Sequence, residues 1–321
     1  MTDRRTFLAG SAVAALMTLG AAVPAVAEWQ PNRPITLIVP FGAGGGTDTI
    51  ARNFASSATE ILGVPVNVVN RPGAGGNTGA AEVARARPDG TTIMITSSGS
   101  WVLGAMLREL EINAFDSFRT IAQIGNLTTS VMVSADSPYQ TLDDLIDAMR
   151  ADPGGLSWGS TGRGSFHHVA VQTFLNELGL DAVDVPFAGG GANRAAVIGG
   201  QVDFGAIGIQ QRAGFEEQLR ALALVSDERD PFSDDVATFE ELGYDIPIVA
   251  SPIAIFGPLD LPDEIADVLE ATAHAVTQDP AFVERMASGT NPVVWRTGAD
   301  TLRLLEEVRD TAAPIIESLQ E

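Results

Sequence analysis

The amino-acid sequence predicts an α/β protein built as two lobes. Short apolar runs rich in β-branched residues alternate with segments whose apolar residues recur at helical spacing. This pattern restarts near residue 126, and acidic helices return at the end of the chain. Such alternation is typical of mostly parallel sheets covered by helices on both faces. We therefore expect lobe 1 over residues 28–128, completed by residues 251–321, and lobe 2 over residues 129–250.

The predicted elements of the first lobe follow the chain in order. ITLIVP (35–40) is a short apolar run bounded by proline and glycine, which indicates a strand. Residues 48–62 place apolar side chains three and four positions apart, which indicates a helix. Two further strands, VPVNVVN (64–70) and TTIMITS (91–97), flank a second helix, NTGAAEVARA (77–86). The turn signal RPDG separates that helix from the strand after it.

The second lobe and the C-terminal part repeat this alternation. Thr141 has the side chain of a helix N-cap, and two aspartates follow in the first turn. LSWGSTG (156–162) is a strand that enters a glycine-rich turn, and a helix is expected over residues 168–178. The remaining predicted elements are the strands DAVDVPF and QVDFGAIG and two acidic helices over residues 262–278 and 299–319.

Composition excludes several classes of protein. With 321 residues, 45% of them hydrophobic, the chain can bury a sizeable core. All 19 basic residues are arginine and face 41 acidic residues, a net charge of −22; removing residues 1–27 takes away two arginines and one aspartate and leaves −23. So acidic a protein repels nucleic acid, and no nucleic-acid partner is expected. Because there is no cysteine, disulfides, thiolate metal sites and a lipid-anchored cysteine are all excluded.

Residues 1–27 have the pattern of an export signal. Arg4 and Arg5 precede an apolar run, which ends in an A-x-A arrangement at Ala27. RRTFL is similar to the start of a twin-arginine signal, and an ordinary secretory leader is the alternative. No later segment is long and apolar enough to cross a membrane. We therefore expect a soluble protein in the periplasm, with its signal peptide removed.

Two glycine-rich segments of the chain echo each other. PFGAGGGTD (40–48) and PFAGGGAN (186–193) share Pro-Phe, a glycine triplet and a following helix, and each comes after an apolar strand. The carboxyl ends of strands are where open α/β sheets bind ligands. Glycines let backbone N–H groups converge on one point, and the new helix adds the positive end of its dipole. The pair predicts a two-sided site for an anionic group; the alternative is two tight turns that bind nothing.

Nucleotide-binding and enzymatic interpretations fit the sequence less well. A Walker A loop needs lysine, which the chain lacks, and a dinucleotide fingerprint would need glycine where Thr47 stands. Neither GRGSF nor SSGSW matches the G-x-S-x-G elbow of a serine hydrolase. His167 and His168 are too close together for simple ligation of a metal from one helix face. We therefore expect no catalytic residues, no cofactor and no metal.

The polar residues near the glycine segments allow two interpretations each. Asp48 can cap its own helix and pair with Arg52 one turn on, or its carboxylate can face the cleft and accept from a ligand hydroxyl or ammonium. Hydroxyl groups close two of the predicted strands, where they can donate to a ligand or only stabilise a turn. These are Ser97, Ser98, Ser160 and Thr161.

The sequence resembles a known family, the extracytoplasmic solute-binding proteins of tripartite tricarboxylate transporters, often called the Bug or TctC family. The similarity covers nearly the whole mature chain and includes, in order, RPITLIVPFGAGGGTDTIAR, NRPGAGGNTGAAEVARARPDGTTIMITSS, STGRGSFHH, VPFAGGGANRAAVIGGQVDFGAIG and LPDEIADVLEATAHAVTQDPAFVERM. The resemblance implies a two-lobed periplasmic binding protein of type II, a Venus flytrap with its ligand cleft between the lobes. It also implies that the protein brings a small organic carboxylate to membrane transporter subunits.

Two other functions remain open beside transport. A sensor accessory to a membrane signalling kinase would have the same fold with a different partner. An enzyme acting on a carboxylated substrate would use Asp48 or His168 as its base. We expect a monomer in each case.

The resemblance also implies which residues meet the ligand. In the family, both glycine segments bind a carboxylate through backbone N–H groups and bridging waters, and the serine-bearing turns would line the far part of the pocket. Of the two histidines, His168 corresponds best to the family's single histidine, which leaves His167 as an addition. The implied ligand-binding residues are Phe41, Gly44, Gly45, Gly46, Thr47, Asp48, Ser97, Ser98, Ser160, Thr161, Gly162, His168, Phe187, Gly189, Gly190, Gly191, Ala192 and Asn193.

One departure from the family pattern bears on the ligand. The second segment of the family often begins with tyrosine followed by a polar or basic residue, where this chain has Phe187-Ala188-Gly189. A phenol hydroxyl and a possible positive charge are therefore missing. This favours a less polar distal group on the ligand and weakens any assignment of citrate.

Overall fold

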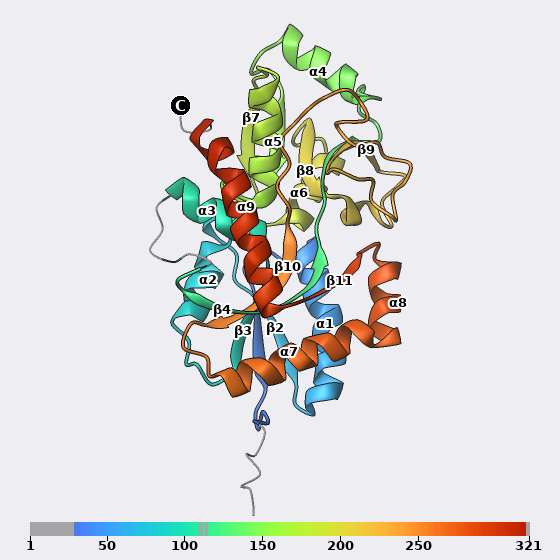
Figure 1. Cartoon of the computed structure of the whole chain (residues 1–321). Helices are drawn as coiled ribbons and strands as arrows, with labels where there is room; N and C mark the ends of the chain where they lie inside the picture. The colour runs from blue at the N-terminus through green and yellow to red at the C-terminus, as the bar shows by residue number, and fades with distance from the viewer. Residues whose placement is uncertain (1–28, 109–111, 113–114, 319–321) are drawn as a thin grey trace, which may run out of the picture.

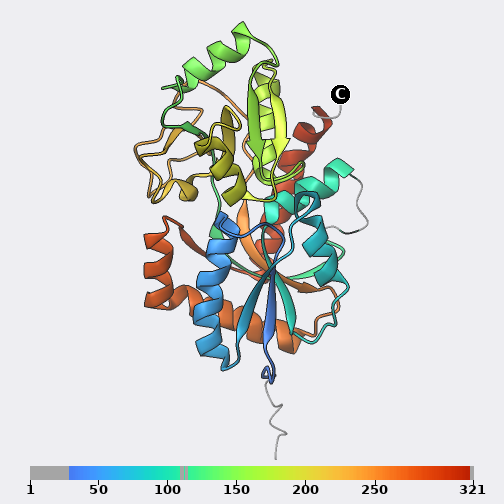
Figure 2. The same ribbon diagram turned by 180° about the vertical axis from the view of Figure 1, so that it is seen from behind.

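Two β-sheets, one in each lobe, form the frame of the molecule (Figure 1). The computed structural model describes residues 29–108, 112 and 115–318, and the predicted export signal at residues 1–27 lies outside them. The predicted α/β class with two separate sheets is confirmed. Seen from behind, the sheet of the first lobe lies below that of the second, and chain segments cross between them (Figure 2).

The sheet of the first lobe has six strands in the order β11-β4-β10-β3-β1-β2. β1 pairs in parallel with β2 and β3, whereas β10 runs antiparallel to both β3 and β4. Its strands come from two parts of the chain that lie far apart in sequence. They are β1 (Ile35–Val39), β2 (Val66–Asn70), β3 (Thr92–Ser97), β4 (Phe118–Asn126), β10 (Pro252–Pro258) and β11 (Val293–Thr297).

The sheet of the second lobe has five strands in the order β7-β6-β8-β5-β9. β6 pairs in parallel with β7 and β8, whereas β5 runs antiparallel to β8 and β9. All five strands come from the middle of the chain. They are β5 (Thr129–Ser134), β6 (Ser157–Ser160), β7 (Val183–Pro186), β8 (Phe204–Gly208) and β9 (Leu219–Val225).

Both sheets are therefore mixed, and the prediction of mostly parallel sheets was wrong in this respect. β4 ends at Asn126, and the chain starts β5 in the other lobe only three residues later, at Thr129. A strand that enters a sheet from the neighbouring lobe starts at the edge where the parallel strands of that sheet have their carboxyl ends. It must run against them, as β5 does against β8 and β10 does against β3.

Helices cover both faces of each sheet, because consecutive residues of the central strands point to opposite faces and are nearly all buried. In β1, Leu37 packs into the core beneath α1, α7 and α8, while the next residue, Ile38, packs into the core beneath α2, α3 and α9. In β5, Val131 faces α4 and α5, while Met132 faces α6. The helices are α1 (Gly46–Leu62), α2 (Asn77–Ala84), α3 (Ser98–Arg108), α4 (Leu142–Ala151), α5 (Phe166–Glu177), α6 (Gly190–Ile198), α7 (Asp263–Gln278), α8 (Pro280–Ser288) and α9 (Gly298–Ser318).

Helix starts follow the local chemistry of the sequence. The predicted N-cap at Thr141 is confirmed: its hydroxyl accepts from the Asp144 N–H, and the Asp144 carboxylate accepts from the Thr141 N–H, a capping box. α5 starts at Phe166, two residues before the predicted start, because the Ser165 hydroxyl caps it by accepting from the His168 N–H. Among the described residues, no helix has the length and apolar character needed to cross a bilayer.

Candidate functional site

The two glycine-rich segments face each other across the lobes. We call residues 40–48, from the end of β1 into the first turn of α1, the first glycine loop, and residues 186–193, from the end of β7 into the first turn of α6, the second glycine loop. The Gly42 N–H donates a hydrogen bond of 2.8 Å to the Ala188 carbonyl oxygen, which joins the lobes through backbone atoms alone. A Cβ on Gly191 would lie 2.9 Å from the Ala43 carbonyl oxygen. Glycine is therefore required at Gly191 because the opposing backbone comes so close.

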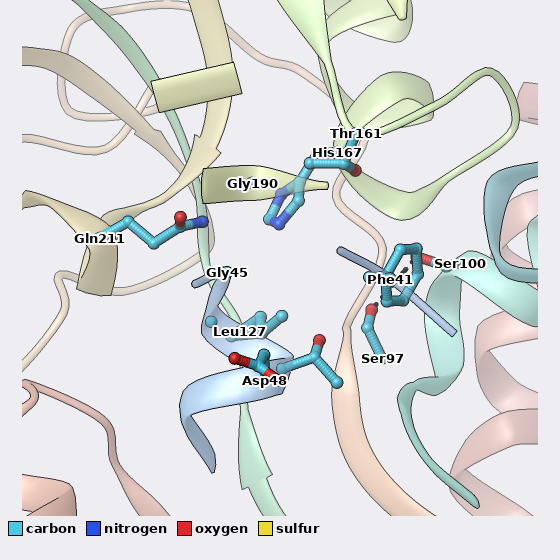
Figure 3. Close-up of a pocket in the computed structure, with 12 residues that line it drawn as sticks. Phe41, Gly45, Asp48, Ser97, Ser100, Leu127, Thr161, His167, Gly190 and Gln211 are labelled. Atoms are coloured by element: carbon cyan, nitrogen blue, oxygen red, sulfur yellow. Dashed lines mark hydrogen bonds between the residues drawn. The ribbon is translucent and has the colours of Figure 1, made fainter. Parts of the chain in front are cut away.

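A small cavity lies behind this contact, with about 340 Å³ of space between the atoms, part of it open to solvent (Figure 3). Both lobes contribute to its wall, so the cavity exists only when the two lobes are together. The polar part of the wall comes from the backbone at the N-termini of α1 and α6, hydroxyls, one imidazole, one carboxamide and the Asp48 carboxylate. The lining residues are Phe41, Gly45, Gly46, Thr47, Asp48, Ser97, Ser100, Leu127, Thr161, His167, Gly190 and Gln211.

Asp48 of the first glycine loop is 3% exposed, and its carboxylate receives four hydrogen bonds from the protein. The Gly44 N–H donates to Oδ2 at 2.9 Å, Asn70 Nδ2 donates to Oδ1 at 2.9 Å, and the Arg52 guanidinium donates to both oxygens at 3.0 and 2.9 Å. The predicted pairing with Arg52 is confirmed, whereas the predicted capping of first-turn N–H groups is wrong, because Asp48 Oδ2 accepts from the N–H of Gly44, which precedes the helix. Four bonds use the accepting capacity of a carboxylate.

Burial by itself would raise the pKa of the Asp48 carboxyl group. The hydrogen bonds from Arg52, Gly44 and Asn70 and the positive charge of Arg52 outweigh it, so that the pKa lies below its ordinary value. Asp48 is therefore ionised at neutral pH, and its charge is paired with Arg52 rather than offered to a ligand.

Asn193 follows the glycine triplet of the second loop as Asp48 follows that of the first. Its side chain is fully buried, and Nδ2 donates to the carbonyl oxygens of Gly159 and Ala206, both at 2.9 Å. These carbonyls belong to β6 and β8, so the amide ties α6 to its own sheet. Predicted as a ligand contact, Asn193 thus lies in the interior of the second lobe and outside the cavity wall.

The hydroxyl groups at the end of β3 divide between the cavity and a contact with the start of β10. Ser97 lines the cavity; its Oγ contacts Ser251 Oγ and lies 3.3 Å from Ser100 Oγ (Figure 3). The Ser98 hydroxyl instead donates to the Pro252 carbonyl oxygen at 2.6 Å and is absent from the lining. Sequence had indicated Ser97 and Ser98, whereas the structure brings Ser97 and Ser100 to the cavity.

The turn after β6 divides in the same way. Thr161 lines the cavity, and its hydroxyl donates to Ser165 Oγ at 2.8 Å. The Ser160 hydroxyl donates to Asp184 Oδ1 at 2.8 Å and holds β6 to β7. Gly162 lines a second hollow, of about 750 Å³, that shares Phe41 and Thr161 with the cavity.

The rest of the predicted glycine-loop residues lie on either side of the contact between the lobes. Phe187 lines the second hollow. A Cβ on Gly189 would come within 2.9 Å of the Gly42 nitrogen, so Gly189 belongs to the contact itself. Gly44 and Ala192 are exposed.

The imidazole on the cavity wall belongs to His167, not to His168. Neighbouring residues point about 100° apart around a helix, so only one of the pair can face the cavity. His168 stacks on Trp158 with ring centroids 5.5 Å apart, and its Nε2 lies 3.7 Å from a carboxylate oxygen of Asp184. It therefore lies against the sheet of the second lobe.

His167 is 6% exposed, and its Nδ1 lies 2.7 Å from Thr129 Oγ1. Burial lowers its pKa from 6.5 to about 4, so the ring is neutral at pH 7. When the Thr129 hydroxyl donates to Nδ1, the proton of the neutral ring is on Nε2, where it can serve a ligand. The imidazole is therefore a polar but uncharged part of the wall.

Sequence reasoning missed four residues of the wall, namely Ser100, Leu127, His167 and Gln211. Gln211 follows β8, whose carboxyl end meets the same edge of the sheet as the second glycine loop, and that position was its only signal. Leu127 lies between β4 and β5, where the chain was expected to pass from lobe 1 to lobe 2, but β4 itself was not predicted and Leu127 was not expected to meet the ligand. Among the described residues, no three potential metal-ligating side chains come together.

A family model described as the tripartite tricarboxylate transporter family receptor matches residues 50–320 of this chain. The chain belongs to the tripartite tricarboxylate transporter receptor family. The resemblance inferred from the sequence is thereby confirmed. Curated relatives agree: a UPF0065 protein of Bordetella pertussis is 33% identical over 315 residues, which is 96% of both chains. Protein BugT of the same organism is 31% identical, over 87% of both chains.

Solved structures of receptors in this family share the two-lobed fold. The periplasmic binding protein BugD superposes with a TM-score of 0.82 at 26% identity, over 90% of this chain and 97% of that chain. MatC from Rhodopseudomonas palustris, solved with bound malate, gives 0.82 at 26% identity over 89% and 99%. A second R. palustris protein, solved with adipate, gives 0.82 at 25% identity over 90% and 97%. The predicted fold class, a two-lobed periplasmic binding protein, is confirmed.

Proposed function

We propose that this receptor captures a small organic carboxylate between its lobes outside the cytoplasm and delivers it to a tripartite tricarboxylate-type membrane transporter. The observation that carries the proposal is the meeting of the two glycine loops over one cavity, with the N-termini of α1 and α6 in its wall. Converging N–H groups and helix dipoles favour an anion. Two structural neighbours, solved with malate and with adipate, support the carboxylate class.

The attraction for the ligand has to be local in this protein. The chain carries a net charge of −22, which repels an approaching anion at long range. At the cavity, uncharged donors act on the ligand over hydrogen-bond distance. The repulsion from charges elsewhere on the surface is screened at physiological salt. The proposed ligand contacts are the backbone N–H groups of both loops and the hydroxyls of Ser97, Ser100 and Thr161.

Transport needs a change of conformation, and the lobes supply one. A ligand that bridges both loops binds the closed arrangement more tightly than the open one and shifts the population toward it. Moving the closed state from 1:99 to 99:1 requires about 5.5 kcal/mol of differential affinity. Two to four charge-assisted hydrogen bonds, at roughly 1.5–3 kcal/mol each, are sufficient.

The location and the division of the chain belong to the same proposal. Export through the segment at residues 1–27 would place the receptor in the periplasm as a monomer, where its transporter can take up the ligand. Lobe 1 would comprise residues 28–128 and 251–321, and lobe 2 residues 129–250. This division is supported by β4 and β10, which belong to the first sheet, and β5 and β9, which belong to the second.

A thermal-shift screen of the purified protein against mono-, di- and tricarboxylates tests the proposal. A ligand at 100 times its dissociation constant should stabilise the protein by about 2.7 kcal/mol, and calorimetry should give one site per chain without turnover. Gly45→Val should abolish the shift, since a Cβ there would lie 3.3 Å from the Gly190 nitrogen. Ala192→Val, on the exposed side of the start of α6, is the matched control and should bind normally. If no carboxylate stabilises the protein, the proposal is wrong.

A further inference from the structure

The side chain of Gln211 is directed into the cavity without a partner. Gln211 belongs to the short 3-10 turn Ile209–Arg212 after β8 and is 5% exposed. Its Oε1 is buried and accepts no hydrogen bond from the described residues. A buried acceptor without a donor is unfavourable, and native structures contain few of them. Oε1 of Gln211, like that of its neighbour Gln210, is therefore free to accept a hydrogen bond from a group outside the protein, and of the two only Gln211 lines the cavity.

The position of this carboxamide ties it to the second glycine loop. A Cβ built on Gly190 would lie 2.2 Å from Gln211 Nε2 and 2.8 Å from Oε1, so the amide fills the space beside the first residue of α6. Figure 3 shows its end directed at Gly190, in the middle of the wall. Any anion held by the N–H groups of α6 would be adjacent to the amide. A carboxamide has a donor and an acceptor side by side, whichever way it is turned.

The charges around the cavity limit the ligand further. None of the described residues that line it is an arginine, and the chain has no lysine. The N-termini of α1 and α6 are used by the first carboxylate, so a second one would have neither a helix N-terminus nor a counter-charge, which is unfavourable in a buried site. Asp48 has the single negative charge of the wall, and its oxygens are already bonded to Arg52, Gly44 and Asn70. It cannot receive a ligand ammonium group without losing one of these bonds.

We propose that the ligand is a small 2-hydroxymonocarboxylate and that Gln211 is the residue that selects it. The acid presents a carboxylate oxygen next to a hydroxyl, an acceptor beside a donor, which is the complement of the carboxamide. Gln211 Nε2 donates to the carboxylate held by α6, and Oε1 accepts from the 2-hydroxyl. Phe41 and Leu127 form the apolar part of the wall and contact the rest of the ligand. This inference rests on the proposed function and narrows it to one class of acid.

Calorimetry with matched pairs of acids tests the inference on the purified protein. Each pair shares a carbon skeleton and differs in the 2-hydroxyl: glycolate and acetate, lactate and propionate, 2-hydroxyisovalerate and isovalerate. In the pair that fits the cavity, the hydroxy acid should bind at least about tenfold more tightly, the equivalent of ~1.4 kcal/mol. Malate, with a second carboxylate, and alanine, with an ammonium in place of the hydroxyl, should bind more weakly than lactate.

Variants at two neighbouring glutamines make the test specific. Gln211→Leu should weaken both acids, because both lose the Nε2 donor to their carboxylate, and should bring the affinity for the hydroxy acid down to that for its deoxy partner. Gln210→Leu is the matched control, because Gln210 is equally buried but does not line the cavity and donates to the Asn126 carbonyl oxygen instead. It should keep the preference for the hydroxyl. Thermal unfolding of both variants shows that they are folded.

The outcomes separate this inference from the proposed function. Tight binding of a dicarboxylate or of an amino acid, with weak binding of every hydroxy acid, would leave the receptor function intact and overturn the inference. A hydroxyl preference that survives Gln211→Leu would overturn the role of Gln211. If no acid of any class binds, the proposed function fails, and this inference fails with it.

Discussion

The two glycine loops have similar sequences, but the matching side chain at the helix start is charged in the first loop and neutral in the second. In the first loop the helix start bears Asp48, an ionised carboxylate paired with Arg52. In the second loop the matching residue is Asn193, a neutral amide bonded to two carbonyl groups of its own sheet. Each side chain anchors its helix, one to the loop and to Asn70, the other to β6 and β8. Similar sequence thus builds two different supports for the same backbone geometry.

This difference teaches which loop attracts an anion more strongly. A carboxylate in the first turn stabilises its own helix by offsetting the positive end of the dipole, by about 0.3–1 kcal/mol. That offset leaves α1 with less attraction for a ligand carboxylate. The first turn of α6 contains no acidic residue, and its positive end is uncompensated. We infer that, of the two loops that contact the anion, the second attracts it more strongly.

Exchanging the side chains of Asn193 and Asp48 should have the largest effect on the free energy of unfolding. Asn193→Asp removes the donor to Gly159 and Ala206 and buries a carboxylate, so the free energy of unfolding should fall by at least about 3 kcal/mol. Asp48→Asn is the control and should cost less than about 2 kcal/mol, since Arg52 is half exposed and solvent screens the pair. Urea unfolding measures both values. Equal losses would mean that the two residues do the same work.

The pH dependence of the unfolding free energy should distinguish His167, in the second lobe, from Asp48, in the first. Burial depresses the pKa of His167 to about 4, so the full stability is present above the unfolded pKa of 6.5. As the pH falls from 6.5 to 4, the unfolded chain binds a proton that the folded protein does not, and the free energy of unfolding decreases. The total is about 3 kcal/mol. The pKa of Asp48 lies below its ordinary 3.8, so its contribution is lost only at more acidic pH.

His167→Asn keeps a group that can bond Thr129 and tests this separation. Its unfolding free energy should change less between pH 6.5 and 4 than that of the native protein. Asp48→Asn should follow the native curve in that range and depart from it only below about pH 4. A native curve that is flat from pH 4 to 6.5 would refute the buried, neutral imidazole.

The smallest expected effect comes from the contact between the loops. A Cβ added by Gly191→Ala would lie 2.9 Å from the Ala43 carbonyl oxygen, so full closure would be opposed. The overpacking should cost about 1–3 kcal/mol. It should therefore lower the affinity for the acid that gives the largest thermal shift by roughly 5- to 150-fold. Gly44→Ala is the control, because a Cβ there meets nothing within 4 Å. It can destabilise the loop through its positive φ, but should keep closure. Calorimetry that gives equal affinities for both variants would exclude the glycine contact as a closure device.

Several features of the fold were predictable because they are local. The strand at residues 35–39 and the helix after it follow from apolar periodicity, and the capping box at Thr141 follows from side-chain chemistry within four residues. β4, β11, α3 and α8 were not located. Their pairing depends on partners far away in sequence, such as β10 with β4, and local propensity is a weak guide to that.

The sequence by itself determined the two glycine loops and the family, since glycine spacing after an apolar strand is a backbone property that needs no partner. Only the tertiary structure decided which side chains meet between the lobes. Which of His167 and His168 faces the cavity depends on how α5 is rotated against its sheet, and Gln211 reaches Gly190 because β8 and the second loop end at one edge. The ligand contacts remain predictions. Asp48, ambiguous in the sequence, is a paired helix anchor, because Asn70 and Gly44 fold onto its oxygens.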